Sequence, residues 1–280
     1  MRLLVVGGGG REHAIIRSLK KNPDVTEIFA LPGNGGIAKD ATCVPIGATD
    51  IDGIVNFARE NAIDYAVVAP DDPLVLGCVD RLNEVGIPCF GPTARAAIIE
   101  GSKAFAKNLM KKYNIPTASY EIFTELDKAL AYLETAPIPT VVKADGLALG
   151  KGVIIAQTRE EAKQAVIDMM EGGIFGKSGS RVVVEEFLTG PEVSVLAFTD
   201  GKVVKPMVSS MDHKRIGDND TGLNTGGMGT IAPNPCYTDD IAARGHGDRV
   251  CAGGERACCG FLCHRRAGEG MPRRNAPHGR

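Results

Sequence analysis

Strand-like and helix-like segments alternate along residues 1–90, and this alternation constrains the fold more than any other feature. Short apolar runs lie at 3–6, 27–31, 65–69 and 88–90, and helical patterns lie between them at 11–20, 51–61 and 74–84. Strands that alternate with helices at this pace form a parallel sheet covered by helices. Because ligands of such sheets lie beyond the carboxyl ends of the strands, we expect the loops 7–11, 32–34 and 70–72 to converge on one site.

A second unit with a different pattern follows a predicted helical connector at 93–113, which carries Lys103. The predicted order is strand 120–123, helix 125–134, strand 140–143, a glycine loop, strand 152–156, helix 159–170 and strand 181–187. Two further strands are predicted at 192–199 and 202–208, and a polar loop at 209–229. The predicted fold class is therefore α/β followed by α+β, with the second unit forming a small lid.

The glycine loop of the lid indicates a binding site for a polyphosphate. Its informative residues are Lys143, Asp145, Gly146, Gly150, Lys151 and Gly152. Glycine lets backbone N–H groups approach a phosphate, and lysine adds a mobile positive charge. A plain glycine-rich hairpin would need neither the two lysines nor Asp145. A Walker P-loop is excluded, because Gly146 and Gly150 are one residue too close and Gly152 occupies the position of the Ser or Thr.

The glycine run at 7–10 favours an anion site over a dinucleotide site. In a GxGxxG pattern the third glycine would fall on Glu12 or His13, and no acidic residue ends the second strand to bind a ribose. The amino end of the predicted 11–20 helix, with Arg11 beside it, suits an anion. A tight strand-to-helix turn explains the glycines equally well.

Two later stretches combine charged residues at strand ends and in a loop. Glu185 and Glu186 end a buried strand and Glu192 begins the next one, where a carboxylate suits ribose hydroxyls. Isolated glutamates at strand ends are, however, usually solvated. The loop 209–229 has basic and imidazole groups followed by Gly-Gly-x-Gly, which suits an anionic ligand, although a solvated loop explains it as well. His213 is a candidate general base, but nothing local identifies the proton that it would take.

Composition argues against several classes of protein. With 44% hydrophobic residues, 24% charged residues and a formal net charge of −2, the chain gives no reason to expect nucleic acid or a membrane as a partner. No apolar run approaches the ~20 residues that cross a bilayer, and the run at 3–6 is too short for a secretory signal. We therefore expect a cytoplasmic protein, in which Cys43, Cys78 and Cys89 are small buried thiols.

The composition changes sharply after residue 238. Residues 239–280 contain no Lys but eight Arg, eight Gly and four Cys, and the apolar periodicity disappears. A zinc site at Cys258, Cys259, Cys263 and His264 would lack a second CxxC pair, so no metal site is predicted. We expect an aberrant, disordered tail at 239–280, encoded by a shifted reading frame or a misjoined segment.

Together these segments resemble the phosphoribosylamine–glycine ligases (glycinamide ribonucleotide synthetases) of the ATP-grasp superfamily. The resemblance is carried by residues 8–14, 32–34, 90–93, 100–105, 143–153, 185–188, 212–215 and 224–229, and it ends near residue 238. It implies a parallel-sheet N-terminal domain at 1–102, a helical connector at 103–118, an ATP-grasp lid at 119–191, an incomplete central ATP-grasp domain at 192–238 and the tail at 239–280.

The resemblance further implies an ATP-dependent ligase that joins glycine to 5-phosphoribosylamine through glycyl phosphate, in purine biosynthesis. Its catalytic residues would be Lys143 and Arg215. ATP would be bound by Lys103, Lys143, Asp145, Gly146, Gly150, Lys151, Gly152, Glu185, Glu186, Leu188 and Glu192. Phosphoribosylamine would be bound by Gly9, Gly10, Arg11, Glu12, Gly33, Asn34, Asp71, Asp212, Lys214, Arg215, Thr225, Gly226 and Gly227. The implied partners are small molecules, and a monomer is expected.

The resemblance also implies Mg²⁺ or Mn²⁺ between the ATP phosphates. Family members hold this ion with a Glu and an Asn on a strand beyond residue 229, and this chain lacks that strand. Without these ligands we expect weak ATP binding and an inactive chain. Two alternatives stay open: a non-catalytic nucleotide-binding fragment with an incomplete central sheet, or another ATP-grasp carboxylate–amine ligase.

Overall fold

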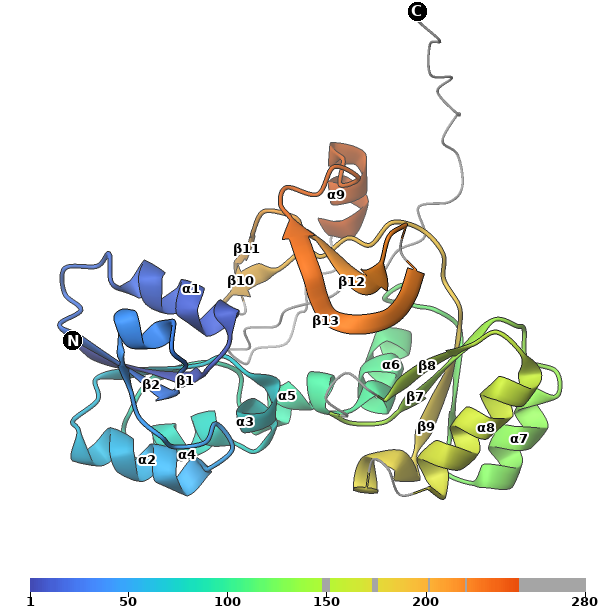
Figure 1. The fold of residues 1–280 in the computed structure, drawn as a ribbon, viewed down its shortest axis with the longest axis horizontal. Coiled ribbons are helices and arrows are strands. Elements are labelled where there is room, and N and C mark those ends of the chain that lie inside the picture. Colours follow the sequence, from blue (N-terminus) through green and yellow to red (C-terminus); the bar gives the residue numbers. More distant parts are fainter. Residues whose placement is uncertain (148–151, 173–175, 201, 220, 247–280) are drawn as a thin grey trace, which may run out of the picture.

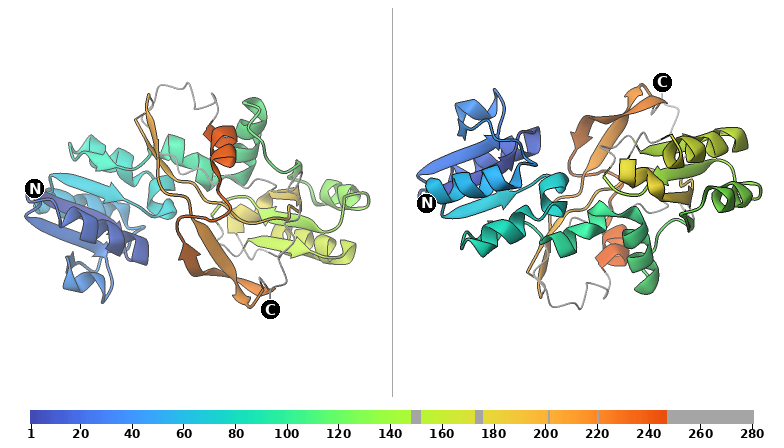
Figure 2. Two further views of the ribbon diagram at one scale, coloured as in Figure 1. Left: turned by 90° about the horizontal axis from the view of Figure 1, so that it is seen from above. Right: turned by 90° about the horizontal axis from the view of Figure 1, so that it is seen from below.

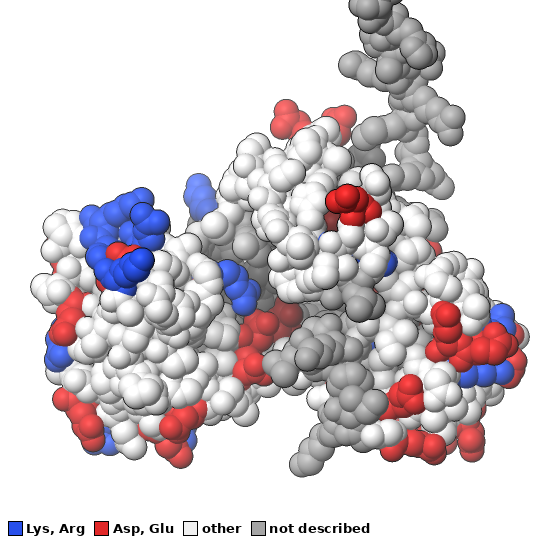
Figure 3. Space-filling view, in the orientation of Figure 1, with Lys and Arg blue, Asp and Glu red and all other residues white. Residues whose placement is uncertain are grey.

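The computed structural model describes residues 1–147, 152–172, 176–200, 202–219 and 221–246. Two bodies of sheet and helix lie side by side, joined by the helices α5 (Ala94–Gly101) and α6 (Lys103–Lys112) (Figure 1). Two β-hairpins, coloured orange, lie over the junction of the two bodies, as the turned views also show (Figure 2). Charged side chains are spread over both bodies and are sparser over the hairpins (Figure 3).

The N-terminal body is a parallel sheet covered by helices, as the sequence predicts. Its strands are β1 (Arg2–Gly7), β2 (Glu27–Pro32), β3 (Thr42–Cys43), β4 (Tyr65–Val68) and β5 (Cys89–Phe90), in the order β3-β2-β1-β4-β5. Its helices are α1 (Gly10–Leu19), η1 (Ile37–Lys39), α2 (Ile51–Glu60), α3 (Asp71–Val75) and α4 (Cys78–Glu84). The chain leaves β1 toward β2, whereas β4 pairs with the other edge of β1. The topological switch point, where such sheets bind ligands, therefore lies at the end of β1.

Both faces of β1 are buried, which explains its continuous apolar sequence. Leu4 and Val6 pack with side chains of α2 and α4, and Leu3 and Val5 pack with Ile16 of α1 on the opposite face. Successive side chains of a strand point to opposite faces, so an unbroken apolar run fills two cores at once.

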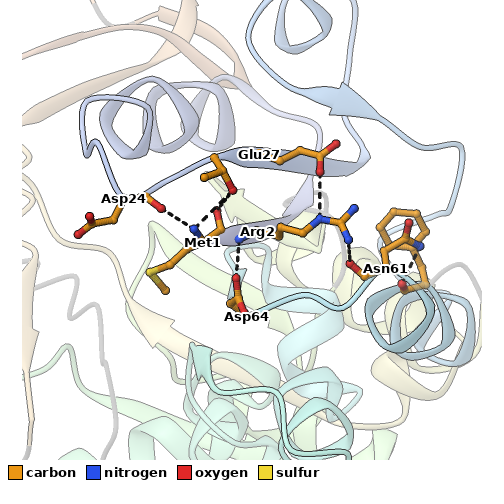
Figure 4. Close-up of polar contacts among 8 residues, drawn as sticks. Met1, Arg2, Asp24, Glu27, Asn61 and Asp64 are labelled. Atoms are coloured by element: carbon orange, nitrogen blue, oxygen red, sulfur yellow. Dashed lines mark hydrogen bonds and ion pairs between the residues drawn. The ribbon is translucent and has the colours of Figure 1, made fainter.

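Polar contacts hold the start of β1 (Figure 4). The Arg2 guanidinium pairs with Glu27 at 3.0 Å and also donates to the carbonyl of Asn61. The Arg2 N–H donates to the Asp64 carboxylate at 2.7 Å. These contacts tie β1 to β2 and to the segment before β4, and so they fix the strand whose far end carries the glycine run.

The second body is an antiparallel sheet with two helices on one face. Its elements are β6 (Tyr120–Phe123), α7 (Leu126–Leu133), β7 (Thr140–Ala144), β8 (Val153–Ala156), α8 (Arg159–Met170), η2 (Gly176–Ser180) and β9 (Val182–Glu186), with strand order β6-β9-β7-β8. Val142 and Val184 are buried with side chains of α7 and α8. The alternating side chains of Lys143 and Glu185 therefore lie on the other face, toward α6.

The structure corrects two predicted helices, each of which is broken. The segment 93–113 forms α5 and α6, because Ser102 is extended (φ −144°, ψ 113°) and its hydroxyl caps α6 by accepting from the N–H of Phe105. The predicted helix 74–84 starts earlier, at Asp71, and is interrupted at Gly77, whose φ of 83° is left-handed.

The polar segment 209–229 was predicted as a loop, and this prediction is wrong. The segment forms most of a hairpin between β12 (Met211–Gly217) and β13 (Thr221–Ile231), whose turn is closed by a hydrogen bond from the Thr221 hydroxyl to the Asp218 carbonyl (2.7 Å). Its backbone groups pair across the two strands, which does not depend on an alternating apolar pattern. No periodic signal therefore marks these strands in the sequence.

The preceding hairpin is shorter than predicted. Its strands are β10 (Ala197–Thr199) and β11 (Val204–Pro206), and an isolated bridge joins Ser194 to Ser210. The Asp200 carboxylate accepts from the N–H groups of Lys202 (2.9 Å) and Val203 (2.8 Å), which forms the turn expected between these strands.

Helix α9 (Asp239–His246) occupies the start of the predicted disordered tail, which corrects that part of the prediction. The Thr238 carbonyl accepts from the N–H of Ala242 at 2.9 Å, and Asp239 and Asp240 place negative charge in the first turn. These local signals start a helix without any apolar periodicity. The rest of the predicted tail, residues 247–280, lies outside the described residues.

Large apolar side chains are exposed on both hairpins. We define the hairpin patch as Leu196, Phe198, Val203, Met207, Val208, Ile216, Met228 and Ile231, whose exposed fractions are 46–62%. The patch lies where charged side chains are sparser (Figure 3). Exposed apolar side chains promote association where they form a contiguous surface.

We expect the double substitution Val208→Lys and Ile216→Lys to weaken the non-specific association that exposed apolar side chains cause at high protein concentration. Both side chains are 62% exposed, so their replacement should change the free energy of unfolding by no more than about 0.5 kcal/mol. Sedimentation velocity measures the association. Val85→Lys, at an exposed position of the N-terminal body, is the control and should leave association unchanged. Equal association of the double variant and the unmodified chain would show that the patch is not responsible.

Candidate functional site

The end of β7 is docked on the start of α6, and this contact fixes the entrance of the glycine loop. The Ser102 hydroxyl and the N–H of Ala104 each donate to Asp145 Oδ1 at 3.0 Å. Arg181 pairs with Asp145 Oδ2 at 3.3 Å. Both oxygens of Asp145 are therefore engaged by protein groups. Its carboxylate positions the loop, whereas the resemblance implies that it contacts the nucleotide.

The next contact involves the first glycine of the loop. Lys103 Nζ donates to the Gly146 carbonyl at 2.6 Å. Gly146 has a φ of 101°, and a Cβ there would lie 2.7 Å from Ser178 Oγ, so conformation and space both require glycine. Gly152 is buried just before β8. The predicted nucleotide-binding residues Gly150 and Lys151 lie outside the described residues.

The centre of the candidate site is a lysine cluster, which we define as Lys103, Lys107 and Lys143 around the carboxylate of Glu185. The Nζ atoms of Lys107 and Lys143 each lie 3.0 Å from Glu185 Oε2. The Lys107 side chain is only 8% exposed, whereas that of Lys143 is 26% exposed. Lys143 can therefore reach a ligand, and Lys107 lies in the interior.

Sequence reasoning identified Lys103, Lys143 and Glu185 but missed Lys107. The available signal was helical spacing, because Lys107 follows Lys103 by four residues and so lies on the same face of α6. That spacing alone could not distinguish a buried lysine from a solvated one. Only the position of α6 against β9 places Lys107 next to Glu185.

Burial lowers the pKa of both Lys103 and Lys107 below the ordinary value of 10.5, and the positive charge of Lys143 lowers both further. The negative charge of Glu185 opposes this shift in both lysines. The carboxylates of Asp145 and Glu100 also oppose the shift in Lys103, so more than one negative charge offsets the lysines. The partly exposed amine of Lys143 is the group that is open to an anionic ligand.

The end of β9 combines sheet contacts with a neighbouring pocket. The Glu185 carbonyl accepts from the Thr140 hydroxyl at 2.9 Å, and the Glu186 N–H donates to the Ser119 carbonyl at 2.9 Å. A pocket beside this strand end is lined by Ser119, Pro137, Ile138, Pro139, Glu186 and Phe187. Leu188, which follows this stretch, is half-buried.

Glu192 is tied to the second hairpin. Its carboxylate pairs with Lys214, which also lies 4.0 Å from Asp212. The Asn234 amide donates to the carbonyls of Glu192 (2.8 Å) and Ser210 (3.0 Å), and Asn234 is only 3% exposed. Sequence reasoning missed Asn234. Its signal was the pair of flanking prolines, which fix the backbone around a polar residue.

Two other hairpin residues that the resemblance assigns to substrate binding stabilise the hairpin through their side chains. The Thr225 hydroxyl donates to the Lys214 carbonyl at 2.9 Å and accepts from the Gly227 N–H at 3.0 Å. Arg215 donates to the Gly222 carbonyl at 2.9 Å. Gly226 is exposed, and nothing lies within 4 Å of a Cβ built on it, so this position is open to a ligand.

The loops after β1 and β2 touch through their backbones. A Cβ on Gly8 would lie 2.6 Å from the Gly33 carbonyl oxygen. The Asn34 amide donates to the Gly8 carbonyl at 2.7 Å, and its oxygen accepts from the N–H groups of Gly36 (2.8 Å) and Ile37 (2.9 Å). Asn34 therefore fixes two loops to each other and is not a purely ligand-facing side chain.

Glu12 also turns inward, although the resemblance implies a substrate contact. It is 3% exposed, and its Oε2 accepts from the Gly9 N–H at 2.5 Å. Its Oε1 is buried without a hydrogen-bond partner among the described residues. The exposed Arg11 and Gly10 remain available at the amino end of α1, which is the anion site that the sequence predicts.

Asp71 connects the N-terminal body with the lysine cluster. It begins α3, directly after the exit of β4. Burial and the negative charge of Asp71 raise the pKa of Glu100, while the positive charge of Lys103 opposes that rise. Glu100 is therefore within electrostatic range of both Asp71 and Lys103.

Two negative findings concern the part of the chain that the structure describes. None of its helices combines the length and the apolar character that a transmembrane segment requires. No group of three or more His, Cys, Asp or Glu side chains there is placed to hold a metal ion.

A parallel substrate-type domain followed by an antiparallel lid, with lysines and a glycine loop at the lid, defines the ATP-grasp class of proteins. Residues 1–100 match the family model for the N domain of phosphoribosylglycinamide synthetase, and residues 101–248 match that for its ATP-grasp (A) domain. The chain belongs to the phosphoribosylglycinamide synthetase family. The resemblance is thus confirmed, and the match continues past residue 238, where the sequence predicts it to end.

Relatives and solved structures agree with this assignment. The phosphoribosylamine–glycine ligases of Vibrio cholerae and Escherichia coli O157:H7 are each 52% identical to the chain over 246 residues, which is 87% of this chain and 57% of each relative. The crystal structure of Thermotoga maritima phosphoribosylamine–glycine ligase is 32% identical, with a TM-score of 0.74 over 88% of this chain and 59% of that chain. The biotin carboxylase domain of Hydrogenobacter thermophilus 2-oxoglutarate carboxylase, in complex with MgADP, shares the fold alone (17% identity, TM-score 0.64).

Proposed function

We propose that this chain provides the ATP-binding and amine-binding parts of a ligase that joins glycine to 5-phosphoribosylamine. The products are glycinamide ribonucleotide, ADP and phosphate, in purine biosynthesis. The observation that carries the proposal is the lysine cluster, in which a partly exposed Lys143 lies 3.0 Å from a buried Glu185 beside the glycine loop. The names of the relatives at 52% identity support the choice of reaction.

In this proposal the nucleotide lies between the lid and the central domain. Lys103 and Lys143 neutralise the charge of its phosphates. Glu185, Glu186, Leu188 and Glu192 line the adenosine. Asp145 contributes indirectly, through the contacts that hold the loop entrance.

Phosphoribosylamine binds at the loops of the N-terminal body. Gly9, Gly10 and Arg11 receive its phosphate at the amino end of α1. Glu12, Gly33 and Asn34 hold these loops in shape. Asp71 lies toward the lysine cluster, so the amine is presented close to the phosphate end of the nucleotide. The remaining contacts come from the second hairpin, through Asp212, Lys214, Arg215, Thr225, Gly226 and Gly227.

The chemistry is two successive substitutions. A carboxylate oxygen of glycine attacks the γ-phosphorus of ATP, the bond from that phosphorus to the bridging oxygen breaks, and ADP leaves. The amine nitrogen of phosphoribosylamine then attacks the acyl carbon, phosphate leaves and the nitrogen loses a proton. Lys143 and Arg215 stabilise the negative charge on the phosphoryl oxygens, and the lid keeps water from the acyl phosphate. The divalent ion that the resemblance implies would supply further positive charge at the phosphates.

The same proposal makes the partners of the chain small molecules, namely ATP, glycine and phosphoribosylamine. We further propose the cytoplasm as its location and a monomer as its state. The domain boundaries at 102, 118, 191 and 238 stay predictions.

The proposal is tested by ADP release from the chain with ATP, glycine and phosphoribosylamine. Release that requires both glycine and phosphoribosylamine supports the proposed ligase, and release with a different amine supports another ATP-grasp ligase. Calorimetry in which the folded chain binds neither ATP nor ADP would overturn the proposal altogether.

A second candidate function is nucleotide binding without catalysis. One observation favours it: the side chains of the hairpin patch are 46–62% exposed, as expected for an incomplete central sheet. ATP binding by calorimetry with no ADP release under any combination of substrates is the expected result for this candidate.

The affinity for ATP is expected to fall as the pH rises. The fall should begin at a pH below 10.5, the ordinary pKa of lysine. The reason is that burial lowers the pKa of Lys103, and only the protonated amine attracts phosphate. Bound phosphate raises that pKa again, so binding should take up protons. Calorimetry between pH ~7 and ~10 in buffers of different ionisation enthalpy measures both effects. Lys103→Arg, which stays charged, should flatten the profile, and a flat profile in the unmodified chain would contradict the role of Lys103.

A further inference from the structure

Lys107 has no role in the function proposed above, yet the structure builds a closed environment for its ammonium group. Its Nζ lies 2.8 Å from the Thr117 hydroxyl, 3.0 Å from Glu185 Oε2 and 3.4 Å from the Ala118 carbonyl. The Tyr120 ring lies 5.4 Å away. These contacts and the low exposure of the side chain leave Lys107 no path to a bound nucleotide.

Glu185 is the group through which Lys107 can act. Its Oε2 is shared by Lys107 and Lys143, and its Oε1 is buried with no hydrogen-bond partner among the described residues. Glu185 is 6% exposed, and a carboxylate so deeply buried needs a cation beside it. The structure supplies two cations, of which only Lys143 faces outward.

The two cations come from different parts of the fold. Lys143 and Glu185 lie on the neighbouring strands β7 and β9 of the lid sheet. Lys107 lies on α6, the helix that also carries Lys103 at its start. Helix α6 therefore adds the positive charge of Lys107 to the ion pair between Lys143 and Glu185, which the lid could form alone.

We propose that Lys107 is a positioning residue, which holds the charge of Glu185 and so frees Lys143 to move onto the polyphosphate of the nucleotide. Without Lys107, a move of Lys143 toward a phosphate would leave a buried carboxylate unpaired, which is strongly unfavourable. With Lys107 in place, Glu185 stays paired. The nucleotide as ligand rests on the proposed function, whereas the coupling of the three side chains does not.

The first test compares ligands with and without phosphates in the full chain, using Lys107→Met. We expect binding of ATP and of inorganic tripolyphosphate to weaken about tenfold, with adenosine binding unchanged. Adding Glu185→Gln to Lys107→Met should restore the ratio of ATP affinity to adenosine affinity, because the carboxylate no longer competes for Lys143. A merely structural Lys107 would weaken all three ligands alike, and that result would overturn the proposal.

A second test needs no nucleotide. The rate at which acetic anhydride acetylates Lys143, read by mass spectrometry, should drop in Lys107→Met because Lys143 is then paired more tightly. Glu185→Gln should restore it. Equal rates in the unmodified chain and Lys107→Met would refute the coupling. This measurement tests the inference separately from the proposed function. If the proposed function is wrong, the unmodified chain should bind neither ATP nor tripolyphosphate, and the acetylation rates should still differ as stated.

Circular dichroism shows whether Lys107→Met folds. If it does not, Glu185→Gln is compared with the double variant Lys107→Met/Glu185→Gln, in which both buried charges are removed. Because Lys107 acts only through Glu185 in this inference, the two should have the same acetylation rate at Lys143. Different rates would overturn it.

Discussion

Replacing Lys143 by alanine is expected to weaken ATP binding by about 10- to 100-fold and to abolish nucleotide-dependent turnover. A hydrogen bond from a charged group contributes about 1.5–3 kcal/mol, which corresponds to this range. The Lys143 side chain is 26% exposed, and its amine is the outward-facing cation beside Glu185. Loss of the amine leaves Glu185 paired with Lys107 at 3.0 Å, so the lid should stay folded. Isothermal calorimetry with ATP, together with thermal unfolding, separates the two effects.

The matched control is Lys163→Ala, on the outer face of α8. Lys163 also pairs with a glutamate, Glu134, and its side chain is 31% exposed, close to the value for Lys143. Its loss should leave ATP affinity unchanged. If Lys143→Ala and Lys163→Ala bind ATP equally well, Lys143 does not bind the nucleotide.

Replacing Gly8 by alanine is expected to destabilise the N-terminal body by about 1–3 kcal/mol, the usual range for overpacking. The new Cβ would lie 2.6 Å from the Gly33 carbonyl oxygen, a backbone atom that cannot turn aside. Moving the two loops apart would also strain the hydrogen bond from Asn34 to the Gly8 carbonyl. Urea unfolding followed by circular dichroism measures the loss.

Gly10→Ala is the matched control, two positions along the same glycine run. Nothing lies within 4 Å of a Cβ on Gly10, and neither Gly8 nor Gly10 has a positive φ. Gly10 begins α1, where alanine is the better helix former, so this variant should be neutral or slightly more stable. If both variants unfold at the same urea concentration, close loop contact is not the reason for glycine at position 8.

The glycine run at 7–10 is a case in which the sequence leaves two interpretations open. The run 7–10 was compatible with an anion site or with a tight turn, and the residues alone could not decide. The structure shows that Gly8 is needed for contact with the neighbouring loop, while Gly10 is open. The tight turn is therefore confirmed at Gly8, and the anion site at Gly10 stays a prediction. The difference comes from a loop that lies about 25 residues away in sequence.

For two acidic residues, the structure differs from what the resemblance implies. Glu12 and Asp145 are implied by the resemblance as ligand contacts, yet both carboxylates turn toward protein N–H or hydroxyl groups. A carboxylate at the start of a helix satisfies backbone donors there, and such local bonds compete with ligand binding. Sequence spacing does not reveal which partner a carboxylate will take.

The sequence by itself determined the order and type of most elements in both bodies, because apolar periodicity and glycine placement are local properties of the chain. It also predicted that Lys143 lies at the end of a strand, whereas it did not predict the break at Ser102 that makes Lys103 the first residue of α6. Only the tertiary structure decided that Lys107, Lys143 and Glu185 meet around one oxygen atom, and that the polar segment 209–229 pairs as a hairpin. The contacts around Glu185 join residues far apart in the chain and depend on how α6 packs against the lid. The hairpin depends on backbone pairing. Neither leaves a periodic pattern in the sequence.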